Sequence, residues 1–322
     1  MSPLSNFFIN FQHAIKELEK FYPIRGKREK LAANFIMSFL EEKGISYEIQ
    51  KFKNQVPNGK SKLICDGVEI KSLPSSFVSG KIRDKNLIPN ILIRENFSEP
   101  NIAFNPYSKA ISLATFYYVA SLTISRNDVQ KVLKADEIYG KVKIKKEKFT
   151  GYNIIVGNIK TSKRLIFAHY DTVLNGAIDN SSGTAFLLSL ITNSKYLKEE
   201  NLFLICGSEE LSFEKPYWGY GYRIFEKEFE YLFKEVKEII VVDCIGFDKP
   251  IFIDSDKNLK MEAFPIKNFE KYEKKIVVFS SISENNIKDF YSFYHSYLDT
   301  KKLLEKKYIE ESFEKFLERI RK

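Results

Sequence analysis

The residues best suited to chemistry lie in the segment HYDTVLNGAIDNSSG, which runs from His169 to Gly183. This segment follows the apolar run RLIFA and contains polar residues that can begin a helix. His169 and Asp171 are two positions apart, so on an extended backbone their side chains point to the same side. One of them can bind a metal ion while the other orients that ligand without binding the metal itself. Asp179 and the residues after it also make a good helix cap, so this segment alone does not establish a metal site.

Ionisable side chains also follow three later apolar runs. Glu209 and Glu210 come after NLFLIC, Asp243 ends EIIVVD, and His295 follows KIVVFS after a short connection. Taken singly, each has an ordinary interpretation: the two glutamates as a solvated pair, Asp243 as a turn or cap residue, and His295 as a structural or exposed histidine. Adjacent carboxylates can also divide the tasks of binding a metal and moving a proton. Because sites in α/β sheets form at the carboxyl ends of strands, we expect these segments to converge on one cleft.

Two histidines and three carboxylates suit a pair of zinc ions with one bridging carboxylate. The chain has three histidines, and the remaining one, His13, lies in a predicted helix without a nearby partner in sequence. We interpret His13 as structural. Cys65, Cys206 and Cys244 are far apart and show no CxxC spacing, so we expect reduced, structural cysteines rather than a disulfide or a zinc ribbon.

A sheet must hold these residues in place, and the second half of the chain has the pattern of one. Predicted strands at 152–157, 164–168, 201–206, 238–243, 250–253 and 275–280 alternate with predicted helices at 182–194, 218–236 and 300–320. Helices at 7–21 and 27–43 and a strand at 46–52 precede them. Near-continuous apolar strands between helices predict an α/β fold, with a mixed, mostly parallel central sheet covered by helices on both faces.

Residues 54–148 have a different texture. Short apolar runs are separated by clusters of Asn, Pro, Gly and Ser, which predicts a mostly β unit. This stretch contains no histidine and no pattern of metal ligands. We therefore predict a larger domain formed by residues 1–53 and 149–322, with a smaller, mostly β domain inserted at 54–148.

Composition limits the class of protein further. The 322 residues are 44% apolar, and no uninterrupted stretch approaches the roughly 20 apolar residues of a membrane helix. The first residues lack the features of a signal peptide, so we expect a cytoplasmic protein. The net charge is +9, but basic residues are interleaved with Glu, so we expect no nucleic-acid or membrane partner. Abundant Lys, Glu and Ile with scarce Gln favour a thermophilic source, and the sequence leaves an oligomer open.

The ordered set HYD, GAIDNSSG, EE, VVD and YHSYLDT resembles the M28 family of zinc-dependent aminopeptidases. The resemblance covers residues 1–50 and 150–322, including the helices around Arg25 and Gly26 and the last helix. It implies the zinc exopeptidase fold and a metallo-exopeptidase that removes N-terminal residues from peptides. Residues 54–148 stand where M28 enzymes often carry a protease-associated domain, and they would be a divergent or shortened version of it.

The resemblance also implies the metal ligands. His169, Asp179 and Asp243 would hold one zinc ion. Asp179, Glu210 and His295 would hold the other, so that Asp179 bridges the two. Another divalent metal such as Co²⁺ or Mn²⁺ would fit the same residues.

The remaining roles follow from the same resemblance. Glu209 would be the general base and acid, acting on a metal-bridging water that serves as the nucleophile. Asp171 would orient His169, and Tyr294 would help to stabilise the oxyanion. The peptide bond Asp179–Asn180 would be cis, as it often is in the family.

Spacing separates this chain from related peptidases. His169 and Asp179 are much closer in sequence than the matching residues of the M42 and M20 peptidases. Glutaminyl cyclases are M28 relatives that use a single zinc ion, and the full ligand set argues against that chemistry. The segment LSFEKPYWGYGYRIF after Glu210 departs from the family's usual glycine-rich turn.

Three other functions stay open at this stage. A related metallohydrolase, such as a carboxypeptidase or a deacylase, would use the same ligands. A non-catalytic member of the fold would act as an interaction module, and a nucleic-acid-binding protein would use the basic surface. The aromatic residues after Glu210 would either line a pocket for an apolar N-terminal side chain or pack the following helix; they are Tyr217, Trp218, Tyr220 and Tyr222.

Overall fold

The structure, a computed structural model, describes residues 3–91, 97–193 and 200–321, and a nine-stranded mixed sheet runs through it. Eight strands follow the order β12-β13-β11-β9-β10-β8-β1-β2, and β4 pairs with β8. Their bounds are β1 (Glu48–Cys65), β2 (Val68–Ile70), β4 (Gly80–Ile82), β8 (Ile138–Val156), β9 (Arg164–His169), β10 (Asn201–Cys206), β11 (Glu238–Val242), β12 (Ile251–Ile253) and β13 (Ile276–Ser280).

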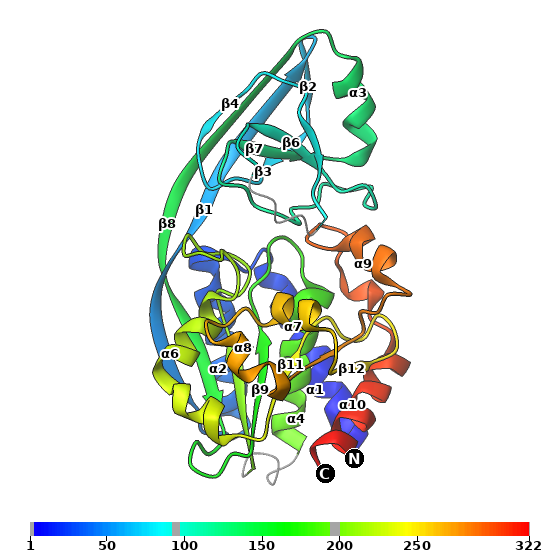
Figure 1. Cartoon of the computed structure of the whole chain (residues 1–322). Helices are drawn as coiled ribbons and strands as arrows, with labels where there is room; N and C mark the ends of the chain where they lie inside the picture. The colour runs from blue at the N-terminus through cyan, green and yellow to red at the C-terminus, as the bar shows by residue number, and fades with distance from the viewer. Residues whose placement is uncertain (1–2, 92–96, 194–199, 322) are drawn as a thin grey trace.

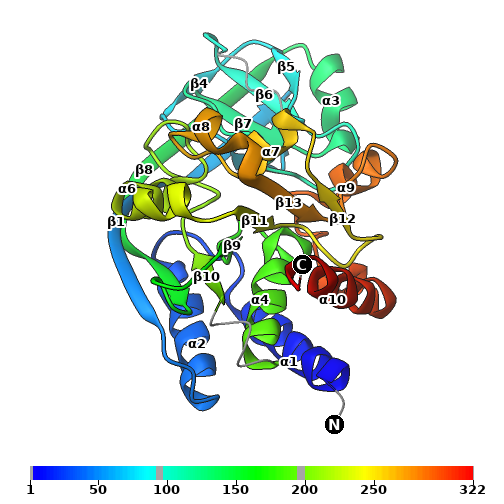
Figure 2. The same cartoon turned by 60° about the horizontal axis from the view of Figure 1, so that its bottom comes forward.

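Helices cover both faces of the part of this sheet formed by β8 to β13 (Figures 1 and 2). One face packs on α1 (Pro3–Leu18), α2 (Glu29–Glu42), α4 (Gly183–Asn193) and α10 (Lys306–Ile320). The other face packs on α6 (Tyr220–Glu235), α7 (Lys257–Ala263) and α8 (Phe269–Tyr272). All residues of β9 and β10 are buried, as two covered faces require. The predicted α/β class and sheet are confirmed.

Short helical turns complete the chain. They are η1 (Glu19–Phe21), η2 (Gly26–Arg28), η3 (Arg126–Asp128), η4 (Ala177–Ser182), η5 (Glu273–Lys275) and η6 (Lys301–Leu303). No helix among the described residues is long and apolar enough to cross a membrane. The predicted helices and most predicted strands lie close to those observed, but α3 (Val129–Lys134), α7, α8 and α9 (Ile287–Phe293) were not predicted.

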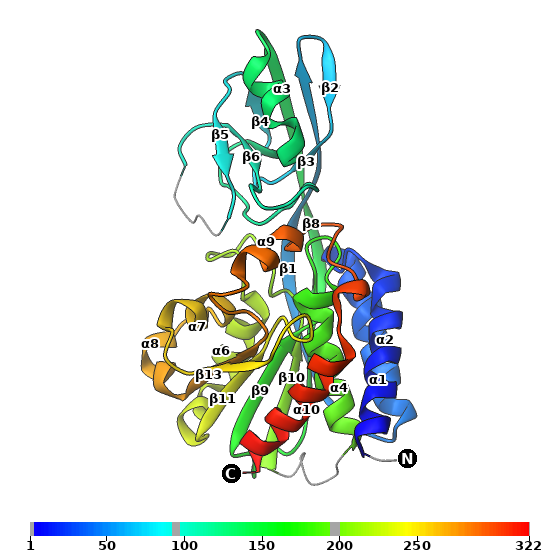
Figure 3. The same cartoon turned by 90° about the vertical axis from the view of Figure 1, so that its right-hand side faces the viewer.

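Two strands are far longer than the sequence pattern indicated. β1 and β8 pair antiparallel without interruption from Glu48 opposite Ile155 to Cys65 opposite Ile138. The predicted strands at 46–52 and 152–157 are only the lower ends of this ribbon, whose upper part rises away from the helices that cover the large sheet (Figures 1 and 3). The predicted domain boundaries at 53 and 149 fall inside β1 and β8, and the division into domains stays a prediction.

The ribbon carries the inserted residues to a position above the carboxyl ends of the parallel strands (Figure 3). There a four-stranded sheet has the order β3-β7-β6-β5. Its elements are β3 (Ser72–Pro74), β5 (Leu87–Pro89), β6 (Asn101–Phe104) and β7 (Ser121–Ile124), followed by α3 (Val129–Lys134). An apolar cluster that includes Phe77, Phe116, Val173 and Leu211 joins the insertion to loops of the larger sheet. The insertion therefore packs directly on the edge where the predicted site lies.

Candidate dinuclear metal centre

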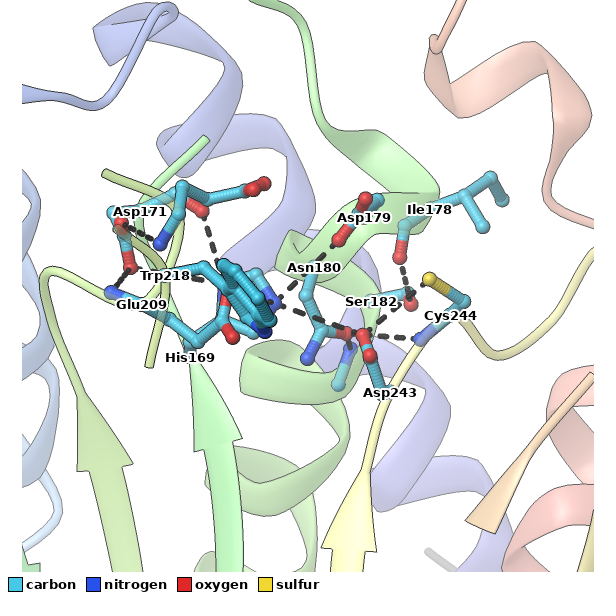
Figure 4. Close-up of polar contacts among 12 residues, drawn as sticks. His169, Asp171, Ile178, Asp179, Asn180, Ser182, Glu209, Trp218, Asp243 and Cys244 are labelled. Carbon is cyan, nitrogen blue, oxygen red and sulfur yellow. Dashed lines mark hydrogen bonds and ion pairs between the residues drawn. The ribbon is translucent and has the colours of Figure 1, made fainter. Parts of the chain in front are cut away.

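The predicted site residues come together because their strands are parallel neighbours. His169 is the last residue of β9 and lies opposite Cys206, the last residue of β10. Glu209 follows β10 by a short loop, and Asp243 directly follows β11, which pairs with β9 on its other side. Figure 4 shows His169, Asp179 and Asp243 meeting above these strand ends.

Two groups of potential ligands form there, and Asp179 belongs to both. In the first group, Nε2 of His169 lies 3.4 Å from Asp179 Oδ1 and 3.6 Å from Asp243 Oδ1. In the second group, Nε2 of His295 lies 3.2 Å from Asp179 Oδ2 and 2.9 Å from Glu210 Oε2. The two oxygens of Asp179 thus face different histidines, which is the arrangement that a bridging carboxylate requires.

The donor atoms fit a pair of zinc ions. Imidazole nitrogen and carboxylate oxygen are ordinary zinc ligands. In each group the potential ligand atoms lie within 4.8 Å of one another. Two buried atoms of the second group, Glu210 Oε1 and His295 Nε2, make no well-aligned hydrogen bond with the described residues. Buried polar atoms rarely stay unpaired, so these two atoms suit a cation at this place.

Both histidines present the same nitrogen to the cluster. Nδ1 of His169 lies 3.1 Å from the main-chain oxygen of Asp171. Nδ1 of His295 lies 3.2 Å from the main-chain oxygen of Leu113. A carbonyl oxygen can only accept a hydrogen bond, so each neutral ring carries its proton on Nδ1. Nε2 is then left with a free lone pair toward the carboxylates, as a metal ligand needs.

Asp171 has a second task that the sequence did not reveal. Its carboxylate oxygens accept hydrogen bonds from the backbone N–H groups of Glu209 and Glu210, both at 2.9 Å. The side chain lies farther from Nδ1 of His169, at 3.6 Å. The main chain of Asp171 therefore orients His169, while its carboxylate fixes the loop that carries the two glutamates.

The turn that presents Asp179 is held from several sides. The Asp179–Asn180 peptide bond is cis, as expected. The Asn180 side chain donates to Val242 O at 2.9 Å and accepts from the N–H groups of Gly183 and Cys244. These bonds tie η4 to the start of α4 and to the end of β11, so the position of Asp179 is fixed relative to Asp243.

Two buried carboxylates around the site were not assigned from the sequence. Asp299 accepts hydrogen bonds from Ile178 N at 2.8 Å and from Asp179 N at 3.1 Å. It lies in the motif YHSYLDT, four residues after His295, and that position was the available signal. Glu29, the first residue of α2, accepts a hydrogen bond from the hydroxyl of Ser208 at 2.8 Å, and nothing near Glu29 in sequence indicated this contact.

The cluster concentrates negative charge away from solvent. Burial raises the pKa of Glu209 well above its usual range, although nearby His169 opposes the shift. Burial also raises the pKa of Glu210 to about 7 against the opposing effect of His295. Burial alone would lower the pKa of His295, but the neighbouring carboxylates of Glu210 and Asp179 raise it to about 10. Without a metal the site therefore holds protons, and divalent cations would replace them.

A cavity of about 420 Å³ opens onto both groups of ligands. Apolar side chains from α9, from the segment after Glu210 and from the insertion line much of it, among them Leu113, Phe116, Trp218, Ile287 and Phe290. Of the four predicted pocket aromatics, Tyr217 and Trp218 line this cavity. Tyr220 and Tyr222 belong to α6: Tyr222 is fully buried in the core, and Tyr220 packs on Phe52 outside the cavity. The pocket interpretation therefore holds for two of the four.

The remaining predicted residues are also placed. Tyr294 lines the cavity and stacks on the ring of His295, with ring centroids 3.8 Å apart. His13 is exposed on α1, where it lies near Phe35 and Phe39, and it belongs to neither group of candidate ligands. Its interpretation as structural stays a prediction. All three cysteines are free and buried, as expected.

Comparison with known proteins bears on the fold. The sequence matches no family model and no curated protein. A zinc aminopeptidase from Bacillus subtilis superposes with a TM-score of 0.64 at 16% identity, covering 94% of this chain and 92% of that one. A peptidase M28 precursor from Shewanella amazonensis gives a TM-score of 0.55 at 14% identity, with 97% and 95% covered.

A glutaminyl cyclase from Porphyromonas gingivalis is also similar, with a TM-score of 0.52 at 12% identity and 98% of each chain covered. At such identities the likeness concerns the fold and not the reaction. It extends over nearly the whole chain, including the inserted unit. The chain therefore has the zinc exopeptidase fold of the M28 peptidases and the related cyclase.

Proposed function

We propose that the protein is a di-zinc aminopeptidase that removes apolar residues from the N-termini of peptides. The observation that carries this proposal is the pair of ligand groups that share Asp179 at the base of a largely apolar cavity. A centre with one ion would need only one of these groups. Here both are complete, and all their side chains are buried except the half-buried Asp243.

The charge of the cavity favours a substrate with a free amino group. Its acidic lining residues are Asp179, Glu209, Glu210, Asp243, Asp256 and Glu262, and no lysine or arginine lines it among the described residues. Two divalent ions would contribute four positive charges against these six carboxylates, which leaves an excess of two negative charges when the histidines are neutral. A substrate ammonium group is attracted to such a site. The carboxylate of a carboxypeptidase substrate would find no basic side chain to bind.

In this mechanism, His169, Asp179 and Asp243 would hold one zinc ion, and Asp179, Glu210 and His295 the other. Ions held there would polarise the scissile carbonyl and lower the pKa of a water molecule toward neutrality. The protein's own contribution to proton transfer comes from Glu209. Its carboxylate lies 4.0 Å from His169 Nε2 and lines the same cavity, without being needed in either ligand group.

Glu209 would take the proton of the attacking water and deliver it to the leaving amine. Proton transfer to or from a group held in position typically contributes about 10²- to 10⁴-fold to the rate. The backbone N–H of Glu209 donates a hydrogen bond to Asp171, which holds the main chain of Glu209 in place and limits where its carboxylate can lie. The apolar walls, including Trp218 and Phe290, would bind the N-terminal side chain of the substrate and limit access of bulk water.

The proposal is tested with aminoacyl p-nitroanilides and with peptides, using protein stripped by chelator and then reloaded with zinc. We expect release of leucine, methionine or phenylalanine that is lost on stripping and regained near two zinc ions per chain. Release of aspartate or lysine should be far slower. Conversion of N-terminal glutamine to pyroglutamate without peptide cleavage would instead indicate a glutaminyl cyclase, and C-terminal or acyl hydrolysis would indicate one of the other metallohydrolases. Metal uptake without any hydrolysis would refute the peptidase and favour an interaction module.

A further inference from the structure

Among the described residues, the inserted unit lines the cavity of the candidate metal centre with one segment, residues 113–116, which forms one wall. The backbone N–H of Leu113 donates to His295 O at 2.9 Å. The oxygen of Leu113 in turn lies 3.2 Å from Nδ1 of the same histidine. One residue of the insertion thus binds both the main chain and the imidazole of a candidate ligand.

Side chains next to this contact strengthen it. The hydroxyl of Ser112 donates to Tyr294 O at 2.7 Å, and Ser112 forms an isolated antiparallel bridge with Ser296. The Asn105 amide donates to Tyr291 O at 2.9 Å and to the Ser112 hydroxyl at 3.1 Å. Asn105, Ser112 and Ser296 are completely buried, so these bonds do not compete with water.

The histidine needs such support because of its backbone. His295 has φ of 48°, in the left-handed region that a non-glycine residue rarely adopts. It follows the end of α9 and is not part of a helix or strand. The local sequence therefore does not fix the direction of the imidazole, and contacts from elsewhere must do so.

We propose that Ser112 and Asn105 are positioning residues for His295, so that the inserted unit completes the second metal site. The proposal rests on the proposed function only in taking His295 as a ligand, with Asp179 and Glu210. The first group, His169, Asp179 and Asp243, makes no such contact with the described residues of the insertion. The insertion is then part of the catalytic centre, and disturbing it should affect one of the two ions selectively.

The variant Ser112→Ala removes the hydroxyl that anchors the segment to Tyr294 and leaves the Leu113 backbone in place. Loss of a group that supports a metal-binding histidine typically weakens binding by about 10- to 100-fold. We expect binding of the second zinc ion to weaken about tenfold and binding of the first to stay unchanged. Competition with a chromophoric chelator measures both constants, and the visible spectrum of the Co²⁺-loaded protein reports the second site separately.

The matched control is Ser121→Ala. Ser121 is also a completely buried serine of the insertion, and its hydroxyl donates to Asn101 Oδ1 at 2.6 Å, within the insertion and without a contact to His295. Each variant removes a hydroxyl that takes part in two buried hydrogen bonds, with Tyr294 and Asn105 for Ser112 and with Asn101 and Ser75 for Ser121. Their thermal unfolding should therefore be similarly affected. Only Ser112→Ala should lose affinity for the second ion, and its activity should return when zinc is raised about tenfold.

The proposal would be overturned if Ser112→Ala and Ser121→Ala bound the second zinc ion with equal affinity. It would also be overturned if Ser112→Ala lost affinity for both ions to the same extent. If Ser112→Ala does not fold, Asn105→Ala with Asn101→Ala as its control makes the same comparison between buried asparagines. The metal titration does not depend on peptidase activity. Uptake of two ions without hydrolysis would refute the proposed function alone, whereas a wild-type protein that binds fewer than two ions would refute both.

Discussion

Replacing Asp171 by asparagine tests how the loop with the two glutamates is held. The change keeps the size of the side chain but turns one carboxylate oxygen into an amide NH₂. In the wild type each oxygen accepts one backbone N–H, from Glu209 or Glu210, at 2.9 Å. Asparagine can satisfy only one of these donors, and the other then faces an NH₂ group at a position that is 1% exposed.

The size of the effect follows from these contacts. An unsatisfied buried donor costs about 1–3 kcal/mol, and a hydrogen bond to a charged acceptor is worth roughly 1 kcal/mol more than one to a neutral acceptor. The free energy of unfolding should therefore fall by about 2–4 kcal/mol. The change also removes a negative charge beside Glu209 and Glu29 and so relieves some repulsion. The loss in free energy of unfolding should therefore lie toward the lower end of this range. If the activation free energy rises by the same ~2–4 kcal/mol because Glu209 is displaced, kcat/KM falls by about 30- to 1,000-fold.

The measurement is urea unfolding of zinc-free wild type and variant, together with kcat/KM of the zinc-loaded forms. Asp66→Asn is a matched control, because the Asp66 oxygens also accept two consecutive backbone N–H groups, from Asp136 and Glu137, at 3.1 and 2.8 Å. Asp66 is exposed, so water can replace the lost acceptor and the change should be under about 1 kcal/mol. Equal effects of the two variants, or a loss below about 0.5 kcal/mol for Asp171→Asn, would refute the reasoning.

Three further predictions concern the same centre. Glu209→Gln should keep both metal ions but lower kcat by about 10²- to 10⁴-fold, as metal analysis and kinetics on one sample would reveal; loss of an ion would make Glu209 a ligand instead. The pKa of metal-free His295 is raised to about 10, so zinc must displace a proton from it at neutral pH. Calorimetry in buffers of different ionisation enthalpy should detect this proton release. The zinc affinity should rise with pH up to about 10. Asp299→Asn leaves one of the two N–H groups of Ile178 and Asp179 without an acceptor, so it should weaken both ions together, and a loss confined to one ion would contradict the shared role of Asp179.

Much of the candidate site could be predicted because parallel strands bring their carboxyl ends to one edge of a sheet. His169, Asp243 and the pair Glu209–Glu210 each follow an apolar run that is long enough for a buried strand. Burial on both faces leaves such a strand only its ends for ionisable residues. The order of the motifs then distinguished the fold, although the similar solved structures described above share 16% identity or less with this chain.

The sequence alone determined the chemical types of the candidate ligands, the longer helices on either side of the sheet and the α/β class, since local periodicity records which face each element buries. It did not determine the length of the β1–β8 ribbon, whose paired residues are too far apart in sequence to leave a local signal. Only the tertiary structure placed Asp299, Glu29 and the insertion residues Asn105 and Ser112 around the ligands. These residues act through hydrogen bonds across long sequence separations, and such bonds exist only after the chain has folded.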